Sequence, residues 1–269
     1  LTTTTDVENY PGYPEGIQGP KMMEDLKKQA ERFGTDVRFG IATAADLSQR
    51  PYTVTVDDKK KIRADALIIA TGASARYLGL ESEEKFKGMG VSACATCDGF
   101  FYKGQDVAVV GGGDSAAEEA LYLAGICNKV YMIHRRDELR ASKIMQERVF
   151  QTENIEILWN SETKEVLGDQ DGVTGVRLMK NTGEEYDIEV SGFFLAIGHK
   201  PNSDIFRGAL DMDDTGYIQT EAGSTHTNVE GVFACGDVQD SIYRQAVTAA
   251  GSGCKAALDT ERFLSVKEF

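Results

Sequence analysis

The stretch Val107-Ala-Val-Val-Gly-Gly-Gly-Asp-Ser-Ala116 decides the fold class. Its apolar run ends in a glycine cluster, and a helix-like stretch over 115–124 and a second apolar run over 129–133 follow. This order is typical of a βαβ unit, in which a helix connects two parallel strands. The sequence therefore predicts an α/β protein with a dinucleotide-binding, Rossmann-like domain around this stretch.

The glycine cluster fits the pattern G-x-G-x-x-A directly after a predicted strand and at the start of a helix. Gly111 permits a tight turn, Gly113 allows the backbone to approach a pyrophosphate, and the small Ala116 lets helix and strand pack closely. Negative phosphate is stabilised at a helix N-terminus, where Asp114 and Ser115 stand. We expect these five residues to bind a dinucleotide. The alternative is a glycine-rich turn followed by a solvated basic loop.

The residues that end the second predicted strand indicate which dinucleotide binds. His134, Arg135 and Arg136 lie there, about 20 residues after the first glycine, and Arg140 follows. An acidic side chain at this position accepts a hydrogen bond from a ribose hydroxyl, whereas basic side chains pair with a 2′-phosphate. The four residues therefore favour NADPH over NADH.

A close cysteine pair, Cys94-Ala-Thr-Cys97, has the spacing used by disulfide oxidoreductases, and Asp98 follows it directly. A structural zinc site needs two more ligands, and the other cysteines and the histidines are isolated in the sequence. An inert, buried pair remains as an alternative. Opening a disulfide also requires a proton donor, and Asp98 is the nearest candidate if burial raises its pKa.

The overall composition excludes several classes of function. The 269 residues carry 43 acidic and 29 basic side chains, a net charge of -14, which disfavours nucleic acid and anionic membranes as partners. No apolar run approaches the roughly 20 residues that a membrane span needs. The chain is therefore expected to be soluble and cytoplasmic, without a metal site.

Several further motifs complete a pattern that extends over nearly the whole chain. They are Leu1-Thr-Thr-Thr-Thr, Glu8-Asn-Tyr-Pro-Gly12, Ala70-Thr-Gly-Ala73, Ser92-Ala-Cys-Ala-Thr-Cys-Asp-Gly99, His134-Arg-Arg-Asp137, Ala196-Ile-Gly-His199 and Gly236-Asp-Val238. Together with the glycine cluster they resemble the low-molecular-weight, bacterial-type thioredoxin reductases, which are NADPH- and FAD-dependent.

The resemblance implies two Rossmann-like domains, with the NADPH domain inserted into the FAD domain. The FAD domain would comprise residues 1–75 and 202–269, and the NADPH domain, with the cysteine pair, residues 76–201. The family's first FAD fingerprint, an N-terminal βαβ unit, is absent from the chain, which we expect to be truncated. By the same resemblance the residues that contact FAD are Asn9, Thr71, Gly72, Gly236, Asp237, Arg244, Gln245 and Ala246.

The resemblance also implies a relay in which electrons pass from NADPH through FAD to the Cys94–Cys97 disulfide, and from the dithiol to thioredoxin. Asp98 would supply protons, and Phe100 and Phe101 would form an apolar docking surface, with ordinary core packing as the alternative for both rings. A homodimer is the family's usual state. Two other functions stay open: an NADPH-binding fragment or scaffold without flavin activity, and a flavin-dependent disulfide reductase that serves another protein.

Overall fold

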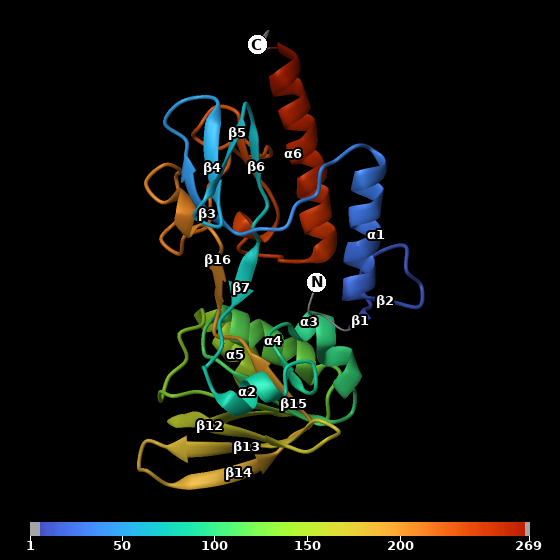
Figure 1. The fold of residues 1–269 in the computed structure, drawn as a ribbon. Helices are drawn as coiled ribbons and strands as arrows, with labels where there is room; N and C mark the ends of the chain where they lie inside the picture. The colour runs from blue at the N-terminus through green and yellow to red at the C-terminus, as the bar shows by residue number, and fades with distance from the viewer. Residues whose placement is uncertain (1–5, 267–269) are drawn as a thin grey trace. The chain divides into compact units, whose positions relative to one another are not determined.

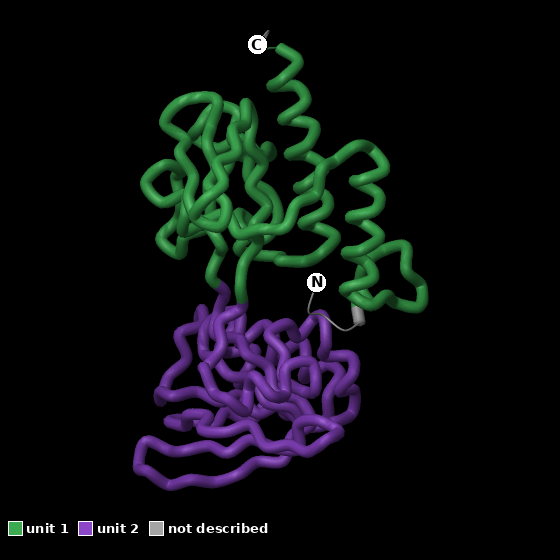
Figure 2. The backbone as a smooth tube through the Cα atoms, in the orientation of Figure 1, with its two compact units in different colours: residues 1–74, 200–269 green, residues 75–199 purple. Residues whose placement is uncertain are grey.

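Figure 1 shows the computed structural model of the chain, which describes residues 6–266. The chain divides into two compact units (Figure 2). Unit 1 comprises Leu1–Ser74 and Lys200–Phe269, and unit 2 comprises Ala75–His199. The motif at residues 1–5 lies outside the described residues. Within residues 6–266, no helix combines the length and the apolarity needed to cross a lipid bilayer.

Unit 2 is built on a parallel sheet of five strands in the order β11-β10-β9-β15-β8. The predicted βαβ unit is present as β9 (Asp106–Val110), α4 (Asp114–Ala124) and β10 (Lys129–Ile133). The other elements of unit 2 are α2 (Glu81–Lys85), β8 (Val91–Ser92), α3 (Ala95–Asp98), the 3-10 helix η1 (Gly99–Tyr102), α5 (Lys143–Gln151), β11 (Ile155–Leu158), β12 (Ser161–Gly168), β13 (Val173–Lys180), β14 (Glu185–Glu189) and β15 (Gly192–Leu195).

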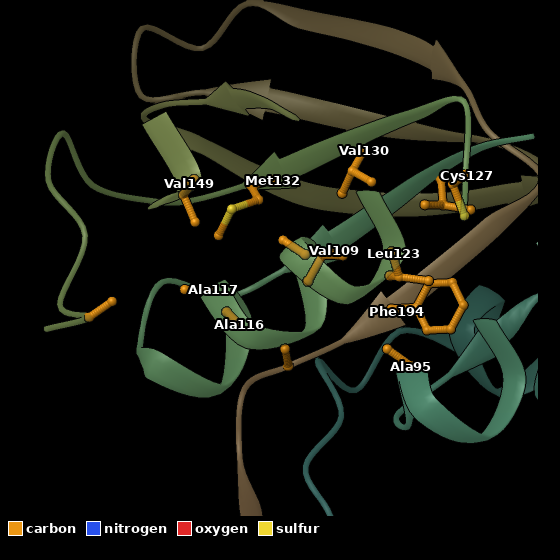
Figure 3. Packing of buried hydrophobic residues seen from close by; sticks show 14 of the residues in the cluster. Ala95, Val109, Ala116, Ala117, Leu123, Cys127, Val130, Met132, Val149 and Phe194 are labelled. Atoms are coloured by element: carbon orange, nitrogen blue, oxygen red, sulfur yellow. The ribbon is translucent and has the colours of Figure 1, made fainter. Parts of the chain in front are cut away.

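The central strand β9 is buried on both faces, as a continuous apolar run predicts. Val107 and Val109 contribute to one core cluster together with Ala116, Ala117 and Leu123 of α4 (Figure 3). Ala108 and Val110, which point the opposite way, belong to a second cluster that includes residues of the antiparallel sheet β12-β13-β14. The sheet therefore lies between a helical layer and a three-stranded layer. The glycine turn follows a strand, β9, that is buried on both faces.

Unit 1 contains a parallel pair of strands, β6 (Leu67–Ile69) and β17 (Val232–Ala234), and an antiparallel sheet of three strands, β3 (Ala42–Asp46), β4 (Tyr52–Val56) and β5 (Lys60–Ala64). Its core gathers Ile69 and Val232 from the parallel pair with Tyr52 and Phe206. The remaining elements are β1 (Asp6–Val7), β2 (Ile17–Gln18), α1 (Gly19–Arg32), the 3-10 helices η2 (Asp204–Phe206) and η3 (Gly236–Val238), and α6 (Ala246–Val266). Two Rossmann-like units make up the fold, and the expected α/β class is confirmed.

The two crossings of the chain between the units lie in short strands. They are β7 (Ala73–Ala75) and β16 (His199–Pro201), which form a two-stranded sheet. The last helix, α6, begins at Ala246, two residues after Arg244. Arg244 has a φ of 47°, which is incompatible with a right-handed helix, so the helix begins only after it.

Candidate active site

A cleft of about 1000 Å³ opens at the carboxyl ends of strands β9, β10 and β15 in unit 2. This is the edge at which doubly wound sheets bind their ligands, and β9 lies where the connections turn to opposite sides. The cleft brings together most residues expected to bind NADPH: Gly111, Gly113, Asp114, Ser115, His134, Arg135, Arg136 and Arg140. Ala116 lies beneath it, fully buried in the core.

Gly111 and Gly113 occupy the turn for different structural reasons. A Cβ at Gly111 would lie 2.5 Å from the carbonyl oxygen of Ala196 and 2.6 Å from the Cβ of Ala116, so only glycine fits there. A Cβ at Gly113 would meet nothing within 4 Å. Gly113 directly precedes α4 in extended conformation. Its open space leaves room for a ligand to approach the N-terminus of the helix, where an anion is stabilised.

The basic loop supplies three exposed cations to the cleft, Arg135, Arg136 and Arg140. None of the ion pairs within residues 6–266 involves them. Guanidinium groups without a carboxylate partner are suited to bind a phosphate in bidentate geometry. The residues present therefore fit a dinucleotide that carries an additional phosphate.

The side chains of two other cleft residues, His134 and Asp114, form hydrogen bonds with the protein backbone. The ring of His134 is 5% exposed, and its Nε2 lies 2.9 Å from the carbonyl oxygen of Glu138. Burial lowers the pKa of His134 and outweighs this hydrogen bond, which acts in the opposite direction. The carboxylate of Asp114 accepts a hydrogen bond of 2.8 Å from the backbone of Ser142, which lowers the pKa of Asp114.

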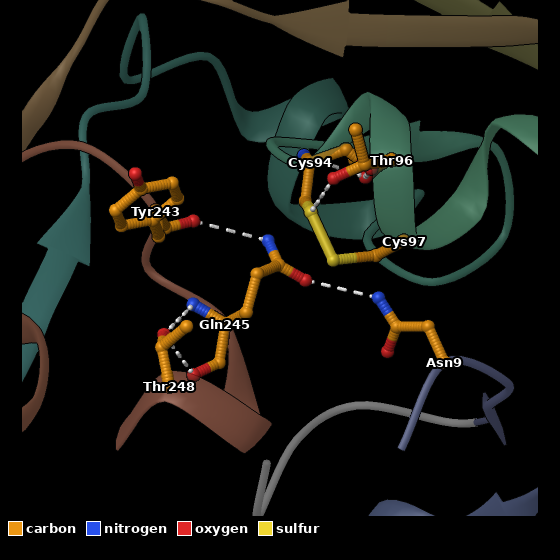
Figure 4. Close-up of a disulfide and its surroundings, with 8 residues drawn as sticks. Asn9, Cys94, Thr96, Cys97, Tyr243, Gln245 and Thr248 are labelled. Carbon is orange, nitrogen blue, oxygen red and sulfur yellow. Dashed lines mark hydrogen bonds between the residues drawn. A yellow bond between two sulfur atoms is a disulfide. The ribbon is translucent and has the colours of Figure 1, made fainter. Parts of the chain in front are cut away.

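Cys94 and Cys97 form a disulfide at the start of α3 (Figure 4). Both cysteines are half-buried, the Sγ of Cys94 lies 3.6 Å from the hydroxyl of Thr96, and the backbone N–H of Cys94 donates to Ser92. Ala95 is buried in the same core cluster as Leu123 of α4. The pair therefore lies on a short helix that is anchored to the core, and neither sulfur is deeply buried.

Asp98 lies directly after the disulfide and is half-buried. Burial raises the pKa of its carboxyl group, against a weaker opposing effect from a hydrogen bond with Ser92. This is the shift that a proton donor at this position requires, since the group must retain its proton closer to neutral pH. Burial thus shifts the pKa of Asp98 in the direction that a proton donor needs.

The three remaining cysteines are free. Cys127 and Cys235 are buried, and Cys254 is exposed. Burial raises the pKa of Cys127 to about 11 and also raises the pKa of Cys235, so both thiols stay protonated and unreactive at neutral pH. Cys235 packs with Phe233 and Ala256 in a small core cluster. Among the five cysteines, Cys94 and Cys97 are the two that form a disulfide.

In unit 1, the residues expected at FAD include Gly236 and Asp237, which follow strand β17. Oδ1 of Asp237 is buried, and among the residues that the structure describes no atom hydrogen-bonds to it. Burial also raises the pKa of this carboxyl group. A buried acceptor without a donor is costly, and the hydroxyl groups of a sugar-like chain would satisfy it. Asp237 therefore fits the ribityl part of a flavin.

The Thr71–Gly72 turn is fixed by one asparagine, Asn202. The side-chain amide of Asn202 donates to the carbonyl oxygen of Thr71 at 2.9 Å, and the backbone N–H of Asn202 donates to Gly72 at 2.9 Å. In return the hydroxyl of Thr71 donates to the carbonyl oxygen of Asn202 at 2.7 Å. Gly72 has a φ of 71°, which this turn requires.

A third segment, 244–246, leads into α6. The hydroxyl of Thr248 donates to the carbonyl oxygen of Gln245 at 2.9 Å, and the side chain of Gln245 accepts a hydrogen bond from Asn9 (Figure 4). Asn9 and Gln245 are thus brought together, while Ala246 is the first residue of α6. The three segments expected at FAD are each ordered by hydrogen bonds within unit 1.

Phe100 and Phe101 follow the redox helix in η1 and are 65% and 46% exposed. The alternative prediction, that both rings pack in the core, is therefore wrong. The two exposed aromatic rings thus form apolar surface directly after the redox helix.

Several residues that support the site could not be predicted from the sequence, because they act through long-range contacts. Asn202 and Ser252, whose hydroxyl accepts from Gly236 at 2.9 Å, gave no signal in the sequence. The carboxylate of Glu83, 2% exposed, accepts hydrogen bonds from Leu78 at 3.1 Å and Gly79 at 2.9 Å, and it thereby holds a wall of the cleft. A glutamate at the third position of a helix can accept from backbone N–H groups that precede the helix, and this position could have indicated Glu83.

Comparison with known proteins is consistent with this geometry. A model of the family described as pyridine nucleotide-disulphide oxidoreductase matches residues 2–253. The chain belongs to the pyridine nucleotide-disulphide oxidoreductase family.

Individual relatives are similar over nearly the whole chain. A curated thioredoxin reductase of Vibrio cholerae is 55% identical over 273 residues, which cover 98% of this chain and 85% of the relative. A curated protein of Pseudomonas fluorescens named glucosaminate ammonia-lyase is 54% identical over 271 residues, covering 98% and 84%. The solved structure of a thioredoxin reductase from Giardia duodenalis aligns with a TM-score of 0.92 at 44% identity, covering 98% of this chain and 86% of that one.

Proposed function

We propose that the chain is a thioredoxin-disulfide reductase that uses NADPH and FAD. The observation that carries the proposal is the Cys94–Cys97 disulfide with Asp98 beside it, a carboxyl group whose pKa is raised by burial. Thiol–disulfide exchange requires a redox-active disulfide and benefits from an adjacent proton donor.

The chemistry follows from these three side chains. When bound, NADPH and FAD supply the two electrons that open the disulfide, and two protons complete the dithiol. The thiolate of Cys94 then attacks a disulfide sulfur of the partner, and the departing partner sulfur takes a proton from Asp98. Cys97 attacks the resulting mixed disulfide, and its proton passes to the second partner sulfur. The proton that Cys94 lost restores Asp98, so the partner leaves as a dithiol and the chain regains its disulfide. The order of the two cysteines follows the resemblance to the family.

The residues that would hold the two cofactors lie in separate units of the chain. For NADPH, the N-terminus of α4 with Gly113 and Ser115 would bind the pyrophosphate, and the exposed arginines of the basic loop the 2′-phosphate. For FAD, Asp237 would accept from the ribityl hydroxyls, and the Thr71–Gly72 turn, Asn9 and segment 244–246 would order the rest.

The proposal extends to the partner and the setting. Phe100 and Phe101 would contact thioredoxin, the chain would form a homodimer, and it would act in the cytoplasm, where thioredoxin keeps thiols reduced. Gel filtration with light scattering tests the dimer.

The decisive experiment follows the flavin and the disulfide together. The purified chain is supplied with FAD, its visible spectrum is recorded, and NADPH is added without oxygen in the presence of oxidised thioredoxin. We expect a flavin band that NADPH bleaches and thioredoxin that gains two thiols. Cys94→Ser and Cys97→Ser are expected to abolish thioredoxin reduction. Cys254→Ser, which alters an exposed free thiol, is the matched control and should retain it.

Each contrary result identifies an alternative. A chain that binds NADPH but takes up no FAD would be a scaffold or sensor without flavin activity. A chain with a bleachable flavin that reduces small disulfides but not thioredoxin would be a reductase for another protein. Retained thioredoxin reduction in both cysteine variants would contradict the mechanism itself.

One relative favours a second candidate function, the elimination of ammonia from an amino sugar acid, because the protein named glucosaminate ammonia-lyase is 54% identical over 98% of this chain. Elimination of ammonia does not require a dithiol. Incubation with glucosaminate and measurement of released ammonia distinguishes the two. Ammonia released equally by the chain and by a Cys94→Ser/Cys97→Ser double variant would favour the lyase.

A further inference from the structure

The glycine turn and the basic loop meet at two residues, Gly112 and His134. A Cβ built at Gly112 would lie 2.2 Å from Cε1 and 2.3 Å from Nδ1 of the His134 ring. Gly112 is buried and the ring is 5% exposed. The backbone of the turn therefore rests directly on the imidazole, and no side chain can be inserted between them.

The ring itself is fixed on its other sides. Its Nε2 is 2.9 Å from the carbonyl oxygen of Glu138, which can only accept a hydrogen bond, so this nitrogen carries the proton. The ring of Trp159 lies edge-on, with the two centroids 6.1 Å apart. The backbone of His134 is held as well, since its N–H donates to Leu158 and its carbonyl oxygen accepts from Ser161, both at 3.1 Å. His134 thus has a single position.

The far end of the basic loop binds the same turn. The carbonyl oxygen of Gly112 accepts hydrogen bonds from the backbone N–H groups of Arg140 at 2.6 Å and Ala141 at 3.0 Å. One residue further, Ser142 donates to the carboxylate of Asp114 at 2.8 Å. The glycine turn is therefore in contact with both ends of segment 134–142. This segment carries the three exposed arginines.

We propose that His134 is a positioning residue for NADPH. Its ring fixes the position of the three arginines relative to the glycine turn, so that the arginines bind the 2′-phosphate while the turn binds the pyrophosphate of the same ligand. This proposal rests on the proposed use of NADPH and assigns His134 a role other than the direct contact expected from the sequence motif. The phosphate is bound by the arginines, and His134 acts through them.

Charge and burial agree with this role. Burial lowers the pKa of His134, and Arg140 and Arg136 nearby lower it further, so the ring is neutral at pH 7 and offers no cation to a phosphate. Its one N–H is already used by Glu138.

The test uses two small ligands that differ only in the 2′-phosphate, 2′,5′-ADP and 5′-AMP, with binding measured by calorimetry on the FAD-supplied chain. We expect His134→Ala to weaken 2′,5′-ADP roughly tenfold and 5′-AMP less than about twofold. His134→Gln, which keeps an N–H donor for Glu138, should lose less. His226→Ala alters a histidine in unit 1 whose ring packs on Phe233, and should change neither affinity.

A double-mutant cycle separates positioning from direct contact. In a chain with Arg135, Arg136 and Arg140 all changed to Ala, the further change His134→Ala should have no additional effect on 2′,5′-ADP. Losses that add would mean that the ring binds the phosphate itself and would overturn the proposal. Equal weakening of both ligands, or no weakening, would overturn it too.

Folding and the proposed function are checked separately. Circular dichroism follows the fold of each variant, and if His134→Ala does not fold, the same cycle is run with His134→Gln. A wild-type chain that binds 2′,5′-ADP no better than 5′-AMP would overturn the proposal. A wild-type chain that prefers 2′,5′-ADP but reduces no thioredoxin would contradict the reductase function alone and would leave the role of His134 in place.

Discussion

The side-chain amide of Asn9 donates a hydrogen bond of 2.9 Å to the side-chain oxygen of Gln245, a residue 236 positions away in the chain. The amide of Gln245 in turn donates to the carbonyl oxygen of Tyr243 at 3.2 Å. The segment around Asn9 is thereby tied to the start of α6, and both ends of the bond belong to the residues proposed to order FAD.

The first prediction concerns this bond. Asn9→Ala should weaken FAD binding by a few-fold up to about tenfold, because a hydrogen bond of this kind contributes about 1 kcal/mol. Titration of the chain with FAD, followed by flavin fluorescence, measures the change. Asn128→Ala removes a comparable exposed bond, from Asn128 to Asp106 in unit 2, and should leave FAD binding unaltered. Equal effects of the two variants would reject a specific role for Asn9.

The second prediction separates two glycines of the turn. Gly111→Ala should destabilise the chain by about 2 kcal/mol or more, because its Cβ would overlap Ala196 and Ala116. Gly113→Ala meets open space, so its stability should change by less than about 1 kcal/mol. It should nevertheless raise the KM for NADPH several-fold, since the methyl group would occupy the approach to the helix. Thermal unfolding and steady-state kinetics give both values, and a Gly113→Ala chain with an unchanged KM would argue against a pyrophosphate at this turn.

The third prediction uses the raised pKa of Asp98. Its folded pKa lies above that of an unfolded aspartate, about 3.9, so ionisation costs the folded state stability as the pH rises above 4. Asp98→Asn should therefore have a higher Tm than the wild type at pH 7, and the difference should shrink as the pH falls below about 4. Thioredoxin reduction should fall by roughly a hundredfold, because the proton donor is lost. A variant that is less stable at pH 7 and equally active would refute both parts.

The fourth prediction is a thiol count. In the oxidised chain, a disulfide reagent at pH 8 should react quickly with Cys254 alone, because it is the one exposed free thiol and burial raises the pKa of Cys127 to about 11. Reduction of the chain should add the two thiols of Cys94 and Cys97. Cys254→Ser should abolish the fast reaction of the oxidised form. Fast labelling of Cys127 or Cys235 would show that the core opens more readily than its packing implies.

The fifth prediction concerns the exposed rings after the redox helix. Changing Phe100 and Phe101 together to Ala should raise the KM for thioredoxin several-fold and leave the reduction of a small disulfide unchanged, because only a protein partner covers the rings. Phe150→Ala in α5 is a control of similar exposure, 58%, and should not alter either reaction. An unchanged KM for thioredoxin would place the docking surface elsewhere.

Much of this arrangement could be predicted from sequence because it depends on neighbours in the chain. The βαβ unit follows from apolar runs on either side of Gly111–Gly113, and the redox loop from the spacing of Cys94 and Cys97. The arginines of the cleft were found because they directly follow a predicted strand. In each case the residues that cooperate lie within a few tens of positions.

The rest could not be predicted, because the contacts join distant segments or depend on backbone geometry. Asn202 holds a turn 131 residues away, and nothing in the residues around it indicates this. The start of α6 depends on the positive φ of Arg244, which helix propensity does not show. The exposure of Phe100 and Phe101, which decides between docking and packing, became visible only in the folded chain.

Helix α4 also acts as a spacer between two chemical groups. The glycine turn, which is proposed to bind phosphate, precedes its first residue. Its last turn supports the redox loop, since a Cβ at Gly99 would lie 2.8 Å from Leu123. Eleven residues of helix hold the two apart by about 16 Å. A nucleotide bound at the turn would thus lie at one end of α4, and the disulfide lies at the other end. Small local movements cannot bring them together, so electrons that travel between them need a carrier from outside unit 2, which is the place of FAD in the proposed relay.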